Sequence, residues 1–119
     1  KGNTHSYYIY PIIVSFDKLK VNRKKIVEKL KKEGILGLMP GYQNLHLLPM
    51  YQNKIAYGTK GFPWTISKRN ISYKKGICPI AENLHDHNFL GIQMCLFDYS
   101  EKDINFIIKA FKKVWKKIS

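Results

Sequence analysis

The sequence predicts an α+β fold, in which a small three-stranded, mainly antiparallel sheet is covered by two main helices. Short runs rich in β-branched and aromatic residues lie near 7–16, 35–39 and 90–97, and such runs suit strands. Two amphipathic stretches with capping signals, at 23–33 and 101–117, have helical spacing. Two packed layers bury the apolar sides of both kinds of element, which is why we expect this architecture.

The first strand and the first helix follow from residue types. Residues 7–16 read Tyr-Tyr-Ile-Tyr-Pro-Ile-Ile-Val-Ser-Phe, and Pro11 removes one hydrogen-bond donor from the ladder. The strand should therefore lie at an edge of the sheet or carry a bulge there. Asn22 can cap the helix and Gly34 can end it. The apolar positions between them are Ile26, Val27 and Leu30.

The middle of the chain is irregular. Residues 35–39 form a second short strand, and in the stretch up to Tyr51 polar, ring-bearing and apolar side chains alternate without a period of 2 or 3.6. Two glycines and a proline between Gln52 and Tyr73 predict a long irregular loop. Such loops are usually functional or mobile, so we expect binding residues in this region.

The last third contains the remaining elements. Pro79 should begin a short helix that ends near His87, because proline suits the first helical position. The run from Phe89 to Phe97 is apolar enough for a third strand covered on both faces. Ser100 can cap the terminal helix. Its apolar face should comprise Ile104, Ile107, Ile108, Phe111, Val114, Trp115 and Ile118.

Length and composition favour one domain, residues 1–119, with a modest core, since 45% of the 119 residues are hydrophobic. No apolar run is long enough to span a membrane, and the first residues lack the apolar run of a signal peptide, so we expect no membrane association. Cys78 and Cys95 are too few for a disulfide framework. A reduced, cytoplasmic chain is therefore predicted.

The net charge is +13, from 21 basic and 8 acidic residues, and only Arg23 and Arg69 of the basic residues are arginine. Proteins that bind nucleic acid rely on arginine for bidentate and stacked contacts, so the lysine excess favours a solvated surface over nucleic-acid binding. The alternative is a free-standing lysine-rich module that binds an anionic partner through residues 18–32 and the terminal helix.

Three motifs lie in a fixed order along the chain. They are Gly34-Ile35, then Tyr42-x-x-Leu45-His46-Leu47-x-Pro49-x-Tyr51, then Tyr73-x-Lys75-Gly76-x-x-Pro79-x-Ala81-Glu82. In order and spacing they resemble the C-terminal part of the DegT/DnrJ/EryC1/StrS family. That family consists of aminotransferases of fold type I that depend on pyridoxal phosphate and act on keto-sugars, mostly nucleotide-linked. The resemblance implies that this chain is the small C-terminal domain of such an enzyme.

Five residues are the candidate substrate-binding set. His46 occupies the Leu-His-Leu-x-Pro position that the resemblance places near the substrate cleft, although its ring could instead bond a backbone carbonyl in a packed loop. Tyr42 and Tyr51 could contact a sugar or a base, or be partly buried with exposed hydroxyls. Tyr73 and Lys75 could reach a phosphate, although a lysine is more commonly solvated.

The resemblance places the cofactor chemistry outside this chain. Family members bind pyridoxal phosphate as a Schiff base to a lysine of a larger N-terminal domain, and no stretch here resembles that domain. We therefore expect no catalytic residue, no covalently bound cofactor and no transaminase activity in this chain alone. The full-length enzyme should be a homodimer that transfers an amino group from an amino-acid donor, glutamate or glutamine, to the sugar.

Two further expectations concern the loop and metals. Residues 42–64 should contribute to a cleft that the N-terminal domain and a second subunit complete, which leaves apolar side chains exposed here, with Lys54, Lys60 or Lys75 at the edge. The sequence His85-Asp86-His87, with its two distant cysteines, lacks the ligand spacing of structural zinc sites. No metal site is expected.

Overall fold

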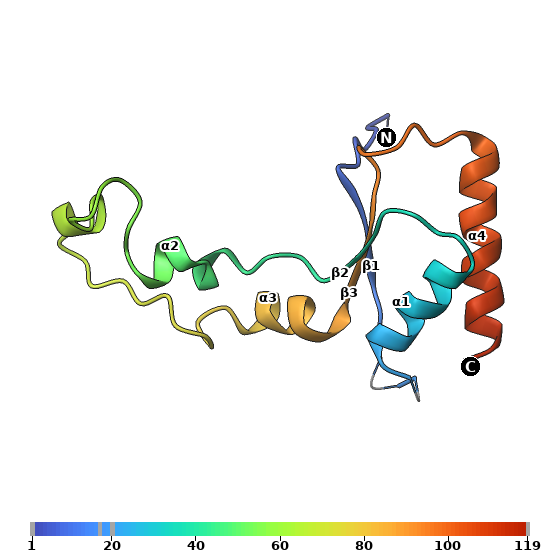
Figure 1. The fold of residues 1–119 in the computed structure, drawn as a ribbon, viewed down its shortest axis with the longest axis horizontal. Helices are drawn as coiled ribbons and strands as arrows, with labels where there is room; N and C mark the ends of the chain where they lie inside the picture. Colours follow the sequence, from blue (N-terminus) through green and yellow to red (C-terminus); the bar gives the residue numbers. More distant parts are fainter. Residues whose placement is uncertain (1, 17, 20, 119) are drawn as a thin grey trace.

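The computed structural model describes residues 2–16, 18, 19 and 21–118, and it consists of a body and an arm (Figure 1). The body contains the sheet and two long helices, and the arm is residues 41–88, which leave the sheet and return to it. The radius of gyration is 18.8 Å. A compact chain of this length would have a radius of gyration of about 13.5 Å, and the projecting arm accounts for the larger value.

The sheet is antiparallel throughout. Strand β1 (Ile9–Ile13) and strand β2 (Leu38–Pro40) lie on either side of the central strand β3 (Phe89–Gln93). Pro11 lies opposite Gly91 on the edge strand β1, where a missing donor costs least. The three-stranded antiparallel sheet and the edge position of Pro11 are therefore confirmed.

Two strands differ from the predicted ranges. β2 begins at Leu38, three residues later than expected, because Gly37 has a φ of +69° and interrupts the extended backbone. β3 ends at Gln93, which pairs with the first residue of β1. The chain then turns, and Leu96 and Phe97 are 66% and 38% exposed. The prediction of a strand covered on both faces was thus wrong beyond Gln93.

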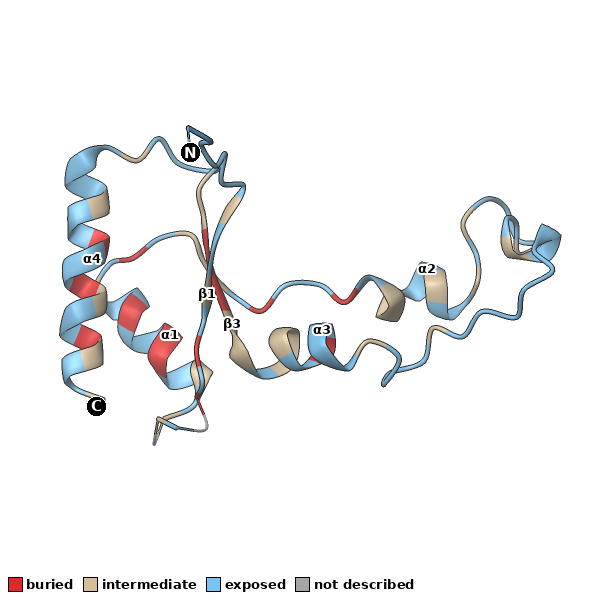
Figure 2. Cartoon of the chain, turned by 180° about the vertical axis from the view of Figure 1, so that it is seen from behind, coloured by how far each residue is buried: buried red, intermediate tan, exposed pale blue. Residues whose placement is uncertain are grey.

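Both predicted long helices are present on one face of the sheet (Figure 2). Helix α1 (Arg23–Lys32) begins after Asn22, whose side chain accepts a hydrogen bond from the Lys25 amide. Helix α4 (Glu101–Lys116) begins with a capping box in which the side chains of Ser100 and Asp103 each bond the other's backbone amide. The capping residues read from the sequence thus fix both helix starts.

The core lies between the sheet and these helices. Leu90 from β3, Leu30 from α1 and Val114 from α4 are almost completely buried and belong to one apolar cluster. Phe111 and Trp115 are half-buried against that cluster, as the predicted apolar face requires. Ile108, also assigned to that face, is 45% exposed, and the buried residues of α4 are Ile107, Ala110 and Val114.

The arm contains several short helices, of which the one that begins at Pro79 was predicted and the others lie where an irregular segment was predicted. Its second leg holds helix α3 (Pro79–Asn83), which begins at the predicted proline and continues as a π-helical turn (Leu84–Asn88). In its first leg, a 3-10 turn (Leu45–Leu47) is followed by helix α2 (Pro49–Gln52), and another 3-10 turn (Trp64–Ile66) lies at its tip. Helix α2 was missed although Pro49 marks its first residue.

Within the part of the chain that the structure describes, no helix combines the length and the apolar character needed to cross a membrane.

The burial pattern predicts unequal effects for two leucines. Leu30→Ala should lower the free energy of unfolding by about 3 kcal/mol, because the side chain is fully enclosed and leaves a cavity. Leu36→Ala, the same change at a side chain that is 65% exposed, should alter it by less than about 0.5 kcal/mol. Urea unfolding followed by circular dichroism measures both. Equal losses would mean that the core is not where the structure places it.

Candidate functional site

The two legs of the arm are joined by His46 and Glu82. The ring nitrogen Nε2 of His46 lies 2.8 Å from Oε1 of Glu82, and the two side chains are only 11% and 7% exposed. His46 comes from the 3-10 turn of the first leg and Glu82 from α3 of the second. The alternative expected for this histidine, a bond to a backbone carbonyl, is replaced here by a bond to a carboxylate.

The Glu82 carboxylate accepts hydrogen bonds from two backbone amides as well as from His46. Both of its oxygens accept the Gly76 amide at 2.8 Å, and Oε1 also accepts the Cys78 amide at 3.2 Å. Burial alone would raise the pKa of Glu82, but the hydrogen bonds from Gly76, His46 and Cys78 outweigh it, so the pKa lies below its ordinary value of 4.5. The ionised carboxylate thus holds residues 76–78 and the opposite leg together.

Three aromatic rings form a second contact between the legs. Trp64 Nε1 donates to the hydroxyl of Tyr73 at 3.0 Å, and the rings of Tyr51 and Tyr73 lie 5.2 Å apart. Gln52 bridges the same legs, because its Nε2 donates to the carbonyls of His46 and Tyr73 at 2.6 Å each. Tyr51, Tyr73 and His46 are therefore adjacent parts of one connected structure.

Arg23 fixes the base of the arm to the body. Its Nη1 donates to the carbonyls of His85 at 2.7 Å and Phe89 at 3.1 Å, and its Nη2 donates to the carbonyl of Asp86 at 3.0 Å. Beside it, Gly41 has a φ of +88°, and a Cβ there would approach the His85 carbonyl to 2.8 Å. Only glycine permits the first leg to pass this close to the second.

Lys75 and Tyr42 lie apart from the aromatic contact. Lys75 Nζ bonds Oδ2 of Asp86 at 2.7 Å, and this hydrogen bond and the charge of Asp86 raise the pKa of the lysine. Tyr42 is 49% exposed at the base of the arm, where its backbone amide donates to Nδ1 of His85 at 3.1 Å. Its hydroxyl makes no hydrogen bond within the described residues.

All five predicted site residues thus lie on the arm, and three of them are in one connected structure. The sequence reasoning did not include Glu82, Gln52 or Arg23 in the site. Glu82 closes the third motif, so its position was available as a signal. Arg23 could have been noticed as one of two arginines among many lysines. Gln52 carries no recognisable signal.

The arm exposes large apolar side chains within residues 42–64, where exposure was expected, and also beyond them at Ile66 and Ile80. The most exposed along the arm are Leu45 at 61%, Tyr57 at 72%, Ile66 at 73% and Ile80 at 78%. Figure 2 shows that burial is concentrated in the body and that most of the arm is exposed.

Among the described residues, no group of three or more histidine, cysteine, aspartate or glutamate side chains is placed to hold a metal ion. Cys78 and Cys95 are both free thiols.

The Glu82 geometry predicts a pH-dependent stability. Because its pKa is lower in the folded chain than in the unfolded chain, its contribution is complete above the ordinary value of 4.5 and is lost as the pH falls through the folded pKa. Glu82→Gln should therefore be less stable than wild type at neutral pH, and the difference should narrow in acid. Urea unfolding across this pH range measures it. Glu28→Gln, at an exposed glutamate of α1, is the matched control, and a pH-independent deficit in Glu82→Gln would contradict the interpretation.

Comparison with known proteins gives one relative of undefined function. Over 111 residues, or 92% of this chain, the sequence is 29% identical to uncharacterized protein MJ1066 of Methanocaldococcus jannaschii. This match covers 24% of that protein, so the chain spans about a quarter of the relative's length. No protein-family model and no solved structure match the sequence significantly.

Proposed function

We propose that this chain is the small C-terminal domain of a pyridoxal-phosphate-dependent aminotransferase of the DegT/DnrJ/EryC1/StrS family, which acts on a nucleotide-linked keto-sugar. The observation that carries the proposal is the bond between His46 and Glu82. These residues belong to the two longer motifs on which the resemblance rests, and the fold joins them at 2.8 Å although 36 positions separate them. Because the two motifs contact each other in the fold, a single family resemblance explains them better than two separate chance matches.

The shape of the arm supports a role within a larger protein. Its legs contain no apolar core of their own, and the buried apolar cluster lies wholly in the body. Exposed side chains such as Leu45, Ile66 and Ile80 would be covered if the arm packed against an N-terminal domain or a second subunit. A relative about four times as long as the match is consistent with additional domains.

The five site residues then have different roles. Tyr42 has an exposed ring and a free hydroxyl, so it is the one best placed to contact a substrate directly. His46, Tyr51 and Tyr73 use their rings to hold the arm together, so they are positioning residues. Lys75, held by Asp86, could meet a phosphate only by exchanging that partner.

The geometry around Lys75 does not suit covalent cofactor binding. A lysine that forms a Schiff base needs a lowered pKa, and the pKa of Lys75 is raised by its bond to Asp86. The family resemblance implies that the cofactor lysine belongs to the N-terminal domain. This chain would contribute substrate contacts and exclude water from the cleft.

The isolated chain should form no specific adduct with pyridoxal phosphate. After incubation with the cofactor and reduction with borohydride, peptide mass analysis should find modification spread over many lysines, because every described lysine except the half-buried Lys54 is exposed. A single dominant modified lysine would contradict this part of the proposal. The same treatment of an unrelated lysine-rich protein gives the background.

In the full-length enzyme, Tyr42→Phe and His46→Ala should each lower kcat/KM for the nucleotide-linked sugar by about fivefold or more, equivalent to about 1 kcal/mol of transition-state stabilisation. Tyr57→Phe is the matched control, because Tyr57 is exposed at the arm's tip and lies outside the motifs. If neither Tyr42→Phe nor His46→Ala differs from wild type, the arm is not part of the substrate site.

A further inference from the structure

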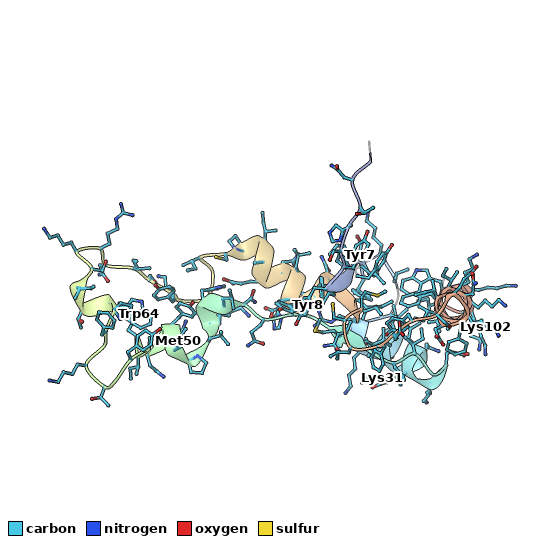
Figure 3. All side chains as sticks on the ribbon, turned by 90° about the horizontal axis from the view of Figure 1, so that it is seen from above. Tyr7, Tyr8, Lys31, Met50, Trp64 and Lys102 are labelled. Atoms are coloured by element: carbon cyan, nitrogen blue, oxygen red, sulfur yellow. The ribbon has the colours of Figure 1, made fainter. Side chains whose placement is uncertain are left out.

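The tip of the arm contains a groove that none of the five site residues lines. It has a volume of about 520 Å³ and lies between the outgoing and returning legs. Trp64 is at its wall, at the end of the arm far from Lys31 and Lys102 of the body (Figure 3). The other lining residues are Asn53, Lys54, Ile55, Thr59, Gly61, Thr65, Ser67, Lys68, Arg69, Asn70 and Ile71.

The charge of this groove is positive and uncompensated. Lys54, Lys68 and Arg69 line it, and no aspartate or glutamate occurs between Glu33 and Glu82 in the sequence. Within the described part of the chain, the side chains of these three cations make no hydrogen bond or ion pair. Three cations that line one groove without an acidic neighbour attract anions, and an anion bound there would interact favourably with them.

Backbone hydrogen bonds hold the segment that forms the groove. Tyr57 and Phe62 form an isolated antiparallel bridge, and the Thr65 amide donates to the Gly61 carbonyl at 3.2 Å. Lys54 has a φ of +52°, and among the described residues it is the only one other than glycine in that conformation. This conformation ends helix α2, because the Lys54 amide donates to the Tyr51 carbonyl and the Ile55 amide donates to the Met50 carbonyl, and it fixes the position from which Lys54 lines the groove.

We propose that this groove binds a phosphate-bearing anion that carries two or more negative charges. Arg69 offers a planar fork of donors for phosphate oxygens, and Lys54 and Lys68 add two point charges. Thr59, Thr65 and Asn70 supply neutral hydrogen-bonding groups in the same groove. Three cations match the charge of a diphosphate better than that of a monovalent ion.

The site is separate from the lysine-rich face of residues 18–32. It is separate from the proposed substrate contact at Tyr42 as well, and it can be tested on the 119-residue chain without a cofactor or a second domain. Failure of this test would therefore leave the proposed aminotransferase function untouched, and failure of the enzyme assays would leave the groove untouched.

The test is a titration of the chain with inorganic pyrophosphate. Calorimetry measures the binding, and NMR monitors the signals of the two tryptophan indole groups. Trp64 lines the groove and Trp115 lies on α4, so only the Trp64 signal should shift. Lys68→Met/Arg69→Met should weaken binding by about tenfold or more, because two charge-assisted contacts are lost. The matched control Lys109→Met/Lys112→Met removes the same charge from exposed positions of α4 and should weaken it by less than about twofold.

Several results would overturn the proposal. Equal losses in the two double variants, shifts at both indoles, or full reversal by sodium chloride at matched ionic strength would mean nonspecific attraction to a basic surface. Vesicles that contain phosphatidic acid, whose phosphomonoester headgroup can carry two negative charges, and vesicles of phosphatidylcholine alone distinguish the source of the phosphate. Retention by the anionic vesicles together with pyrophosphate competition would assign the site to a lipid headgroup. Pyrophosphate binding without retention would assign it to a soluble ligand.

Discussion

The arm depends on one buried carboxylate. Glu82 accepts hydrogen bonds from the amides of Gly76 and Cys78 and from the ring of His46, so a single side chain fixes a turn and joins two legs. An ionised group with so little exposure is stable only when its oxygens are satisfied by donors, and here they are. The lowered pKa of Glu82 reflects these hydrogen bonds. Without this contact, the paired legs would be held by the aromatic contact, the Gln52 bridges and the bond from the Tyr42 amide to the His85 ring.

The body and the arm are stabilised by different kinds of interaction. The body buries aliphatic side chains such as Leu30, Leu90 and Val114 between a sheet and two helices, where the hydrophobic effect acts without strict geometry. The arm buries almost none, and it is held by directional bonds that Glu82, Gln52 and Arg23 make at short distances. Structures held in this way open more readily than a packed core.

Much of the body could be predicted because its signals are local. Asn22 and Ser100 mark helix starts through short-range hydrogen bonds, and Pro11 marks an edge strand by removing a donor. Strand ends were less predictable, since β3 stops where its neighbour β1 begins rather than where its own apolar run ends. In the arm, the motifs singled out His46 and Tyr73 as site residues. The residues next to them in the sequence did not indicate that His46 would bond Glu82 or that Tyr73 would bond Gln52.

The sequence by itself determined the α+β class, the two capped helices, the antiparallel strands and the segment that carries the motif residues. It could do so because capping, proline placement and hydrophobic period act over a few neighbouring residues. Only the tertiary structure decided that residues 41–88 project as an arm, that His46 meets Glu82, and that Arg23 holds the arm's base. Those contacts join residues 36 and 62 positions apart, and their partners are chosen by how the whole chain folds back on itself.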